Sequence, residues 1–184
     1  MVFNQHFCDK EAFNACLHPF IRNAVGCMEF GGCFLNKRLN RNNDGGTPRR
    51  TTDIFQLATT VLFQNPVQNF ALAPNNLKDV SPVCMDYMKT VPTTWDETCF
   101  IDGYPGKYVV LARRHGNTWY LAAVNAGKEI VKLKLDLDMF AGKTVSLYKD
   151  DKKGEPQLVT LKVKESGKVQ LEILPQGGVV LVNN

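Results

Sequence analysis

The cysteines and histidines are the first residues whose types and spacing could do chemistry. The 184-residue chain has six cysteines, at Cys8, Cys16, Cys27, Cys33, Cys84 and Cys99. They form no Cys-x-x-Cys pair, and no histidine pair has zinc-finger spacing, so we expect no structural metal site. We expect reduced, mostly buried thiols, with disulfides as the alternative. His18, next to Pro19, is expected to be packed or in contact with solvent rather than a general base.

A tryptophan beside two acids, Trp95-Asp96-Glu97, is a second candidate for chemistry. An aromatic face next to carboxylates is one way to hold a sugar ring. A tryptophan also buries a large area, and this one lies between two stretches of different character. We favour the second interpretation, in which Trp95 is a wedge that locks one part of the chain to the other.

Residues 36–50 contain five basic residues, one acidic residue and almost nothing apolar, which is typical of a loop. An anion-binding or substrate-facing loop is one interpretation, and a solvated excursion is the one that we favour. No aromatic residues are interleaved with the basic ones to stack on bases, and the whole chain has 22 basic against 18 acidic residues. Nucleic acid is therefore not an expected partner.

The sequence contains no run of about 18 apolar residues, the length of a membrane span, and its first six residues do not read as a signal peptide. We therefore expect no membrane partner. Taken alone, these two observations point to the cytoplasm.

The elements that must position these residues differ between the two halves of the chain. In the first half, residues 51–63 carry a helical stripe of apolar residues, which Thr51 or Thr52 can cap and whose first turn suits Asp53. The stripe consists of Ile54, Leu57, Ala58, Val61 and Leu62. A second helix is predicted to begin after Ser81, a natural N-cap followed by proline, and to end before Pro92.

After about residue 93 the apolar period changes to two. Apolar and polar residues alternate over residues 131–138, 159–163 and 169–173. Turn residues separate such runs at intervals of about eight to twelve residues. We predict a self-contained antiparallel sandwich of seven or eight strands, with its boundary near residues 90–95.

Residues 1–36 are expected to be irregular or short-strand backbone. Together with the two predicted helices they would bury too little apolar surface to offset the entropy lost on folding. The first half is therefore expected to lack something on its N-terminal side.

Three segments resemble glycoside hydrolase family 97, a family of α-glucosidases and α-galactosidases. Residues 17–30, LHPFIRNAVGCMEF, resemble the family segment Leu-Pro-Phe-Thr-Arg followed by Gly-Pro-Met-Asp-Tyr, and residues 51–58 are similar to the family's last barrel helix. Residues 91–114, VPTTWDETCFIDGYPGKYVVLARR, resemble the entry into its C-terminal sandwich nearly residue for residue. The resemblance runs from about Leu17 to the end of the chain.

Enzymes of this family have an N-terminal super-sandwich, a (β/α)8 barrel and a C-terminal β-sandwich. The resemblance implies an α+β chain in which residues 1–92 are the terminal strand and helices of an incomplete barrel. Residues 93–184 would be an antiparallel β-sandwich that braces the barrel and supports oligomerisation. A complete (β/α)8 barrel usually needs about 250 residues, so a 184-residue chain cannot hold one beside a sandwich.

Glycoside hydrolysis needs two carboxylates beside the scissile bond. In the family the acid usually lies in an Arg-Gly-x-Glu stretch shortly before the segment that residues 17–30 resemble, and nearby glutamates hold a calcium ion. This sequence contains no Arg-Gly dipeptide. The resemblance therefore places the catalytic residues and the calcium ligands upstream of Met1. No catalytic residue, metal ligand or cofactor is expected in this chain, and calcium is expected only in the full-length enzyme.

Arg22 and Glu29 are the candidate substrate-binding residues that the resemblance suggests. Glu29 stands where family members usually have aspartate, and Cys27 stands where they have proline. We weigh a Glu29 that lines the sugar site against a structural Glu29 paired with Arg22, seven residues earlier, and favour the structural one.

The chain is thus expected to be the C-terminal portion of a family-97-like α-glycosidase that hydrolyses terminal α-linked glucose or galactose in its full-length form. Alone it is expected to be inactive and to have a structural role. The alternative is a carbohydrate-binding module that uses Tyr104, Trp119 and Tyr120. Expected partners are a second copy of the chain, through the sandwich, and an oligosaccharide in the full-length enzyme only. Full-length relatives are expected in the bacterial periplasm.

Overall fold

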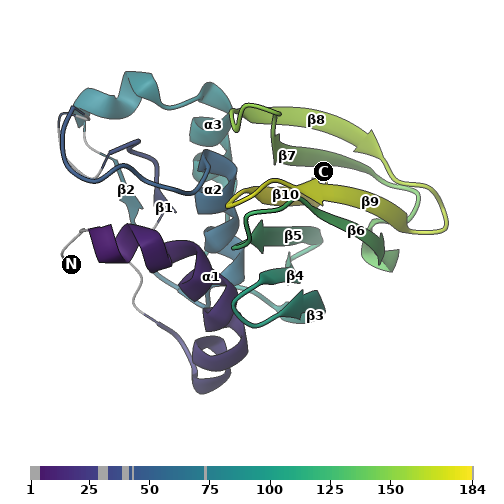
Figure 1. The fold of residues 1–184 in the computed structure, drawn as a ribbon. Helices are drawn as coiled ribbons and strands as arrows, with labels where there is room; N and C mark the ends of the chain where they lie inside the picture. The colour runs from purple at the N-terminus through teal and green to yellow at the C-terminus, as the bar shows by residue number, and fades with distance from the viewer. Residues whose placement is uncertain (1–4, 29–32, 39–41, 43, 73, 184) are drawn as a thin grey trace.

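The first half of the molecule is mainly helical (Figure 1). A computed structural model describes residues 5–28, 33–38, 42, 44–72 and 74–183. The elements of this half are α1 (Gln5–Val25), β1 (Cys33–Phe34), α2 (Asp53–Leu62), β2 (Phe70–Ala71), the 3-10 helix η1 (Pro74–Asp79) and α3 (Pro82–Thr90). β1 and β2 pair in parallel, with α2 between them in the chain.

The second half consists of antiparallel strands, as the alternating pattern predicts. Its elements are β3 (Glu97–Tyr104), β4 (Tyr108–His115), β5 (Thr118–Asn125), β6 (Val131–Asp136), the 3-10 helix η2 (Asp138–Phe140), β7 (Thr144–Asp150), β8 (Pro156–Lys162), β9 (Lys168–Ile173) and β10 (Gly178–Asn183). One sheet has the order β3-β4-β5-β10-β7-β8, and β6 and β9 form a second sheet. The fold is therefore α+β with a β-sandwich.

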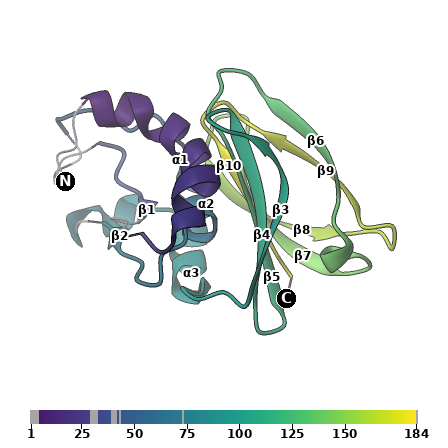
Figure 2. The same cartoon turned by 90° about the horizontal axis from the view of Figure 1, so that it is seen from below.

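The six-stranded sheet is covered on both faces (Figure 2). The helices lie against one face and the β6–β9 sheet against the other. Successive side chains of β4 point to opposite faces of the sheet. Val109 and Leu111 belong to the buried cluster under the helices, which we call the helix-side core. Val110 and Ala112 belong to the buried cluster between the two sheets, which we call the inter-sheet core. The sandwich is therefore not self-contained, contrary to the sequence-based expectation, because its large sheet has a second apolar face.

The two helices predicted from their stripes and caps are confirmed. The Phe55 amide donates to Thr52 Oγ1 over 3.1 Å, so Thr52 is the N-cap of α2. The Val83 amide donates to Ser81 Oγ over 3.3 Å at the start of α3. α2 is buried along its whole length and lies directly on β5 and β10.

The expectation of irregular or short-strand backbone over residues 1–36 is wrong for residues 5–25, although residues 26–28 and 33–36, with the short strand β1, agree with it. Residues 5–25 form the long helix α1, in spite of Pro19 within it. Its buried face has small side chains at helical spacing, Cys8, Ala12, Ala15 and Cys16, which allow α1 to approach β4 and β5 closely. The larger apolar residues of the helix are spread around it, so the sequence shows no clear stripe.

The alternation at residues 159–163 does not bury one face throughout. Val163 is buried and Leu161 is partly buried, but Val159 is exposed. The reason is that β8 lies at the edge of the large sheet and the two-stranded β6–β9 sheet covers the other face only in part.

Candidate functional site

The described structure includes only one of the two residues predicted to bind substrate. Arg22 lies in the last turn of α1 with an exposed side chain. Glu29 lies outside the described residues. The pairing of Arg22 with Glu29 and their roles toward a sugar therefore stay predictions.

His18 is a packing residue. Its ring lies edge-on to Phe63, with 5.6 Å between the ring centroids. Burial, with a smaller effect from the charge of Arg22, lowers the pKa of His18 below its usual value. The neutral imidazole is the form that suits this apolar contact.

Trp95 lies between the helices and the large sheet, as the wedge interpretation predicts. Its ring contacts Tyr120 edge-on at 5.3 Å between centroids, and it packs against the helix-side core. The guanidinium of Arg113 lies 5.9 Å from the ring centroid. Neighbouring Asp96 is used locally, since its Oδ2 accepts the Gly116 amide over 2.7 Å. Trp95 and Asp96 are thus both engaged in packing and turn formation.

Arg113 is a buried cation that the sequence did not reveal. Its side chain extends from β4 to the C-terminal end of α2, where Nη1 donates to the carbonyl of Phe63 over 3.1 Å. A cation is favoured there by the helix dipole. Burial lowers the pKa of Arg113 to about 10. Arg113 therefore fastens the C-terminal end of α2 to the sheet.

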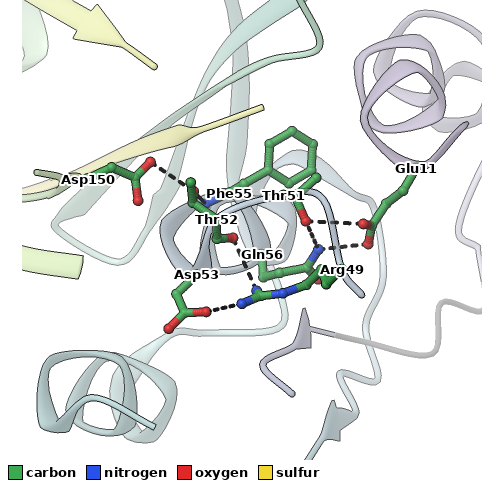
Figure 3. Close-up of polar contacts among 8 residues, drawn as sticks. All are labelled: Glu11, Arg49, Thr51, Thr52, Asp53, Phe55, Gln56 and Asp150. Carbon is green, nitrogen blue, oxygen red and sulfur yellow. Dashed lines mark hydrogen bonds and ion pairs between the residues drawn. The ribbon is translucent and has the colours of Figure 1, made fainter. Parts of the chain in front are cut away.

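A polar cluster fastens the other end of α2 (Figure 3). We call it the α2 polar junction; it comprises Glu11, Arg49, Thr51, Thr52, Asp53, Gln56 and Asp150. These residues come from α1, the loop before α2, α2 itself and β7. The junction therefore joins three segments that are far apart in the sequence: α1, the start of α2 with the loop before it, and β7.

On the α1 side, Glu11 accepts hydrogen bonds from two residues of the α2 region. Gln56 Nε2 donates to Glu11 Oε1 over 2.7 Å, and Thr51 Oγ1 donates to Glu11 Oε2 over 3.1 Å. Gln56 Nε2 also donates to Thr51 Oγ1 over 2.8 Å. Burial is the main cause of a raised pKa at Glu11, which its hydrogen bonds only partly oppose.

On the solvent side of the junction, Arg49 and Asp53 form an ion pair with only 6% and 11% of their side chains exposed. Arg49 Nη1 also donates to the Thr52 carbonyl over 3.2 Å. The loop that contains Arg49 is expected to be a solvated excursion, and the buried side chain of Arg49 departs from that expectation. A pocket of about 280 Å³ beside the pair has both signs of charge in its walls, including Lys37 and Glu155.

On the sheet side, Asp150 at the end of β7 contacts the starts of both α2 and β10. Its Oδ2 accepts from Thr52 Oγ1 over 2.8 Å and from the Gly178 amide over 3.0 Å. Burial raises the pKa of Asp150 to about 6, against the opposing effect of these hydrogen bonds. The three carboxylates of the junction, those of Glu11, Asp53 and Asp150, thus all accept hydrogen bonds from protein donors. These contacts hold α2 against α1 and the large sheet.

The raised pKa of Asp150 predicts that protonation stabilises the fold. Because the folded pKa lies about two units above the ordinary value of 3.8, stability should increase as the pH falls from 7 through 6 to 4, by about 2 kcal/mol from this group. An Asp150→Asn variant should lose that increase. Urea unfolding of both proteins at pH 7 and pH 4 measures it, with exposed Asp136→Asn as control. An equal pH dependence in wild type and Asp150→Asn would contradict the prediction.

Comparisons with known proteins identify a family match in the second half of the chain. The family described as "Glycosyl-hydrolase 97 C-terminal, oligomerisation" matches residues 94–182. The chain carries a glycoside hydrolase family 97 C-terminal domain. The match begins beside Trp95, where the sequence pattern changes, and ends in the last strand, β10.

The similarity extends beyond the family 97 domain into the helical half. The crystal structure of a beta-arabinopyranosidase is 84% identical, with a TM-score of 0.96 over 99% of this chain and 29% of its own. A glycoside hydrolase family 97 enzyme from Pseudoalteromonas sp. strain K8, in complex with acarbose, is 25% identical, with a TM-score of 0.79 over 98% of this chain and 30% of its own.

A curated relative shows the same partial coverage. The retaining alpha-galactosidase of Bacteroides thetaiotaomicron is 27% identical over 180 residues, which are 89% of this chain and 26% of the relative. The chain therefore spans less than one third of the length of each of these three proteins. What it resembles in each is a region that includes the family 97 domain and the helices before it.

The aromatic residues of the family 97 domain do not form a binding row for sugar. Tyr120 is buried in the helix-side core, and Trp119, next to it on β5, packs against the inter-sheet core. Tyr104 is exposed, with Lys107 Nζ 4.7 Å from its ring centroid. The three side chains thus lie in different parts of the domain and do not form one surface on which a sugar could stack. The alternative of a carbohydrate-binding module is therefore not favoured.

The described cysteines agree with the expectation of reduced thiols. Five cysteines are free: Cys8, Cys16 and Cys84 are buried, whereas Cys27 and Cys99 are more accessible. The side chain of Cys33 is not among those that the structure describes. Burial raises the pKa of Cys16 and of Cys84 to about 12 in each case. Within the described part of the chain no group of three or more His, Cys, Asp or Glu side chains could hold a metal ion. The described residues also contain no helix that is both long and apolar enough to cross a membrane.

Proposed function

We propose that this chain is part of a glycosidase that releases terminal β-arabinopyranosyl or α-galactosyl residues. The observation that carries the proposal is the 84% identity with a beta-arabinopyranosidase over nearly the whole chain. In this enzyme residues 1–92 complete the (β/α)8 barrel, and residues 93–184 brace it and contribute oligomer contacts. The expectation of glucose or galactose is thereby narrowed to sugars of galactose-like configuration.

The two sugar names among the relatives are chemically compatible. A β-L-arabinopyranosyl residue has the same ring stereochemistry as an α-D-galactosyl residue and lacks only its exocyclic hydroxymethyl group. One active site can therefore hold both rings, and discrimination depends on space and hydrogen bonds around the missing group. The loss of apolar contact is worth about 1 to 3 kcal/mol, whereas a site that hydrogen-bonds the hydroxyl discriminates by a factor of about 10⁴ to 10⁵.

The barrel role of the helical half is supported by its connectivity. β1, α2 and β2 follow one another, and β1 pairs with β2 in parallel, with Cys33 opposite Phe70. A strand, a helix and a parallel strand are the repeating unit of a (β/α)8 barrel. Such a pair cannot close by itself, so the unit needs further strands beside it.

The chain alone is predicted to have no glycosidase activity. The proposed acid, its partner carboxylate and the calcium ligands belong to the rest of the barrel, and the carboxylates of the α2 polar junction are engaged as structural acceptors. Purified chain should not hydrolyse p-nitrophenyl β-L-arabinopyranoside, α-galactoside or α-glucoside above the uncatalysed rate, with or without calcium. Clear turnover that survives repurification would contradict this assignment.

A chimera tests the proposed function directly. This chain would replace the corresponding region of the beta-arabinopyranosidase to which it is 84% identical. Because most buried contacts are shared at that identity, the chimera is expected to keep p-nitrophenyl β-L-arabinopyranoside hydrolysis within about tenfold of the parent, a loss of at most about 1.4 kcal/mol. A folded chimera with no activity would overturn the proposal. The parent lacking the whole region is the matched control and should be inactive or insoluble.

A further inference from the structure

The two edges of the large sheet differ in how far they are protected. At β3 the register shifts between Phe100 and Asp102, and Gly103 has φ +147°. β8, at the other edge, pairs with β7 in unbroken register from Pro156 to Lys162 (Figure 1). In the described residues it has a hydrogen-bonded neighbour on one side only. β8 is therefore a regular strand with an open side.

The centre of β8 is apolar on both faces. Leu158 and Val159 point to opposite sides of the sheet and are 48% and 36% exposed. Thr160 after them is also exposed, and the charged residue of the strand, Lys162, is at its end. An edge with exposed β-branched and apolar residues and no central charge is one that pairs readily with another strand.

We infer that β8 pairs antiparallel with β8 of a second copy of the chain, around a two-fold axis close to Val159. This inference rests on the proposed oligomer role and locates its surface. A two-fold interface brings the same patch of both copies together, and antiparallel pairing of one strand with itself satisfies that requirement. The two large sheets then become one continuous sheet.

The charges of β8 fit this arrangement. With Val159 on the axis, Leu158 faces Thr160 of the second copy and Pro156 faces Lys162, so no like charges are opposed. Glu155, one residue before the strand, then faces Val163 of the second copy. Self-pairing of β8 therefore brings no two charges of the same sign together.

Sedimentation velocity of the full chain over a range of concentrations tests the inference. Val159→Lys places two lysines opposite each other at the axis and is expected to weaken dimerisation by at least about tenfold. Leu158→Lys is a second variant with the same expectation. Val67→Lys is the matched control, because Val67 is an equally apolar residue that is 68% exposed outside the sandwich. Phe100→Lys tests the opposite edge, where Phe100 is 56% exposed.

The outcomes separate the surface from the oligomer role. A wild-type dimer that only the two β8 variants dissociate supports the inference. A dimer that survives both β8 variants, or that Phe100→Lys dissociates, overturns the β8 assignment and leaves the oligomer role standing. A wild-type chain that is monomeric at all concentrations overturns both. Hydrogen exchange of the wild type gives an independent readout, since β8 amides should gain protection as the concentration rises, and unchanged exchange counts against the interface.

Discussion

Replacing Gly178 with valine is expected to lower the free energy of unfolding by at least about 3 kcal/mol. A Cβ atom at this position would lie 2.7 Å from both the backbone nitrogen and the Cα atom of Phe55, and 2.8 Å from the carbonyl carbon of Ile54. The obstacle is the backbone of α2, which cannot turn aside as a side chain can. Ile54 and Phe55 are themselves fully buried, so α2 can move away only by opening the helix-side core.

The size of the effect follows from the place of Gly178 in the fold. It is the first residue of β10, and its amide also donates to Asp150 of the α2 polar junction over 3.0 Å. Displacing α2 from this strand therefore disturbs the helix-side core and the junction together. For a chain of this size the loss corresponds to a fall in melting temperature of about 6 to 12 °C.

Thermal and urea unfolding of Gly178→Val and wild type measure this prediction. Thr144→Val, which places the same side chain at an exposed strand position, is the control and should unfold like the wild type. Gly178→Ala should be intermediate, because its single methyl group meets the same backbone atoms. A Gly178→Val protein with the wild-type midpoint would show that α2 does not lie on β10 as described.

Removing residues 1–92 is expected to have a still larger effect on the sandwich. The large sheet buries six side chains in the helix-side core: Val109, Leu111, Tyr120, Ala122, Val124 and Val180. Without the helices these side chains would face water. At about 2 kcal/mol for each of the five larger ones, the loss is about 10 kcal/mol, as large as the whole stability of a typical domain at about 5 to 15 kcal/mol.

The consequence for the isolated sandwich is loss of cooperative folding or aggregation. An exposed apolar face of this kind is much larger than the scattered patches that soluble monomers tolerate. The inter-sheet core would remain, but the β6–β9 sheet alone covers only one face of the large sheet. The family model thus matches the sandwich separately from the helices. In the structure, however, the sandwich and the helices share the helix-side core.

The local elements of this fold could be predicted because their signals are local. The stripe of α2 and its cap at Thr52 lie within a dozen residues, and the alternation in β6 and β9 is visible in the sequence alone. α1 could not be predicted in the same way. Its buried face is made of alanine and cysteine, whose apolar signal is weak, and Pro19 reads as an end to a helix.

The contacts that fasten helix to sheet could not be predicted, because they join residues distant in the sequence. Thr52 and Asp150 are 98 residues apart, and Arg113 reaches a carbonyl 50 residues earlier. In the sequence Arg113 reads as one of two adjacent basic residues at the end of a strand, where exposure is the usual state. Only the packing of α2 across the sheet shows that it is buried.

The central claim is that the helical half and the sandwich share one core and fold as one unit. Its most direct test is urea unfolding of residues 1–184 and 93–184, both with Trp95→Phe, so that Trp119 is the single remaining tryptophan of the two in the sequence. Trp119 packs against the inter-sheet core and is present in both proteins. We predict one transition of Trp119 fluorescence in the full chain, coincident with the loss of circular dichroism, and no comparable transition in the fragment. A soluble fragment that unfolds cooperatively at the same urea concentration as the full chain would contradict the account.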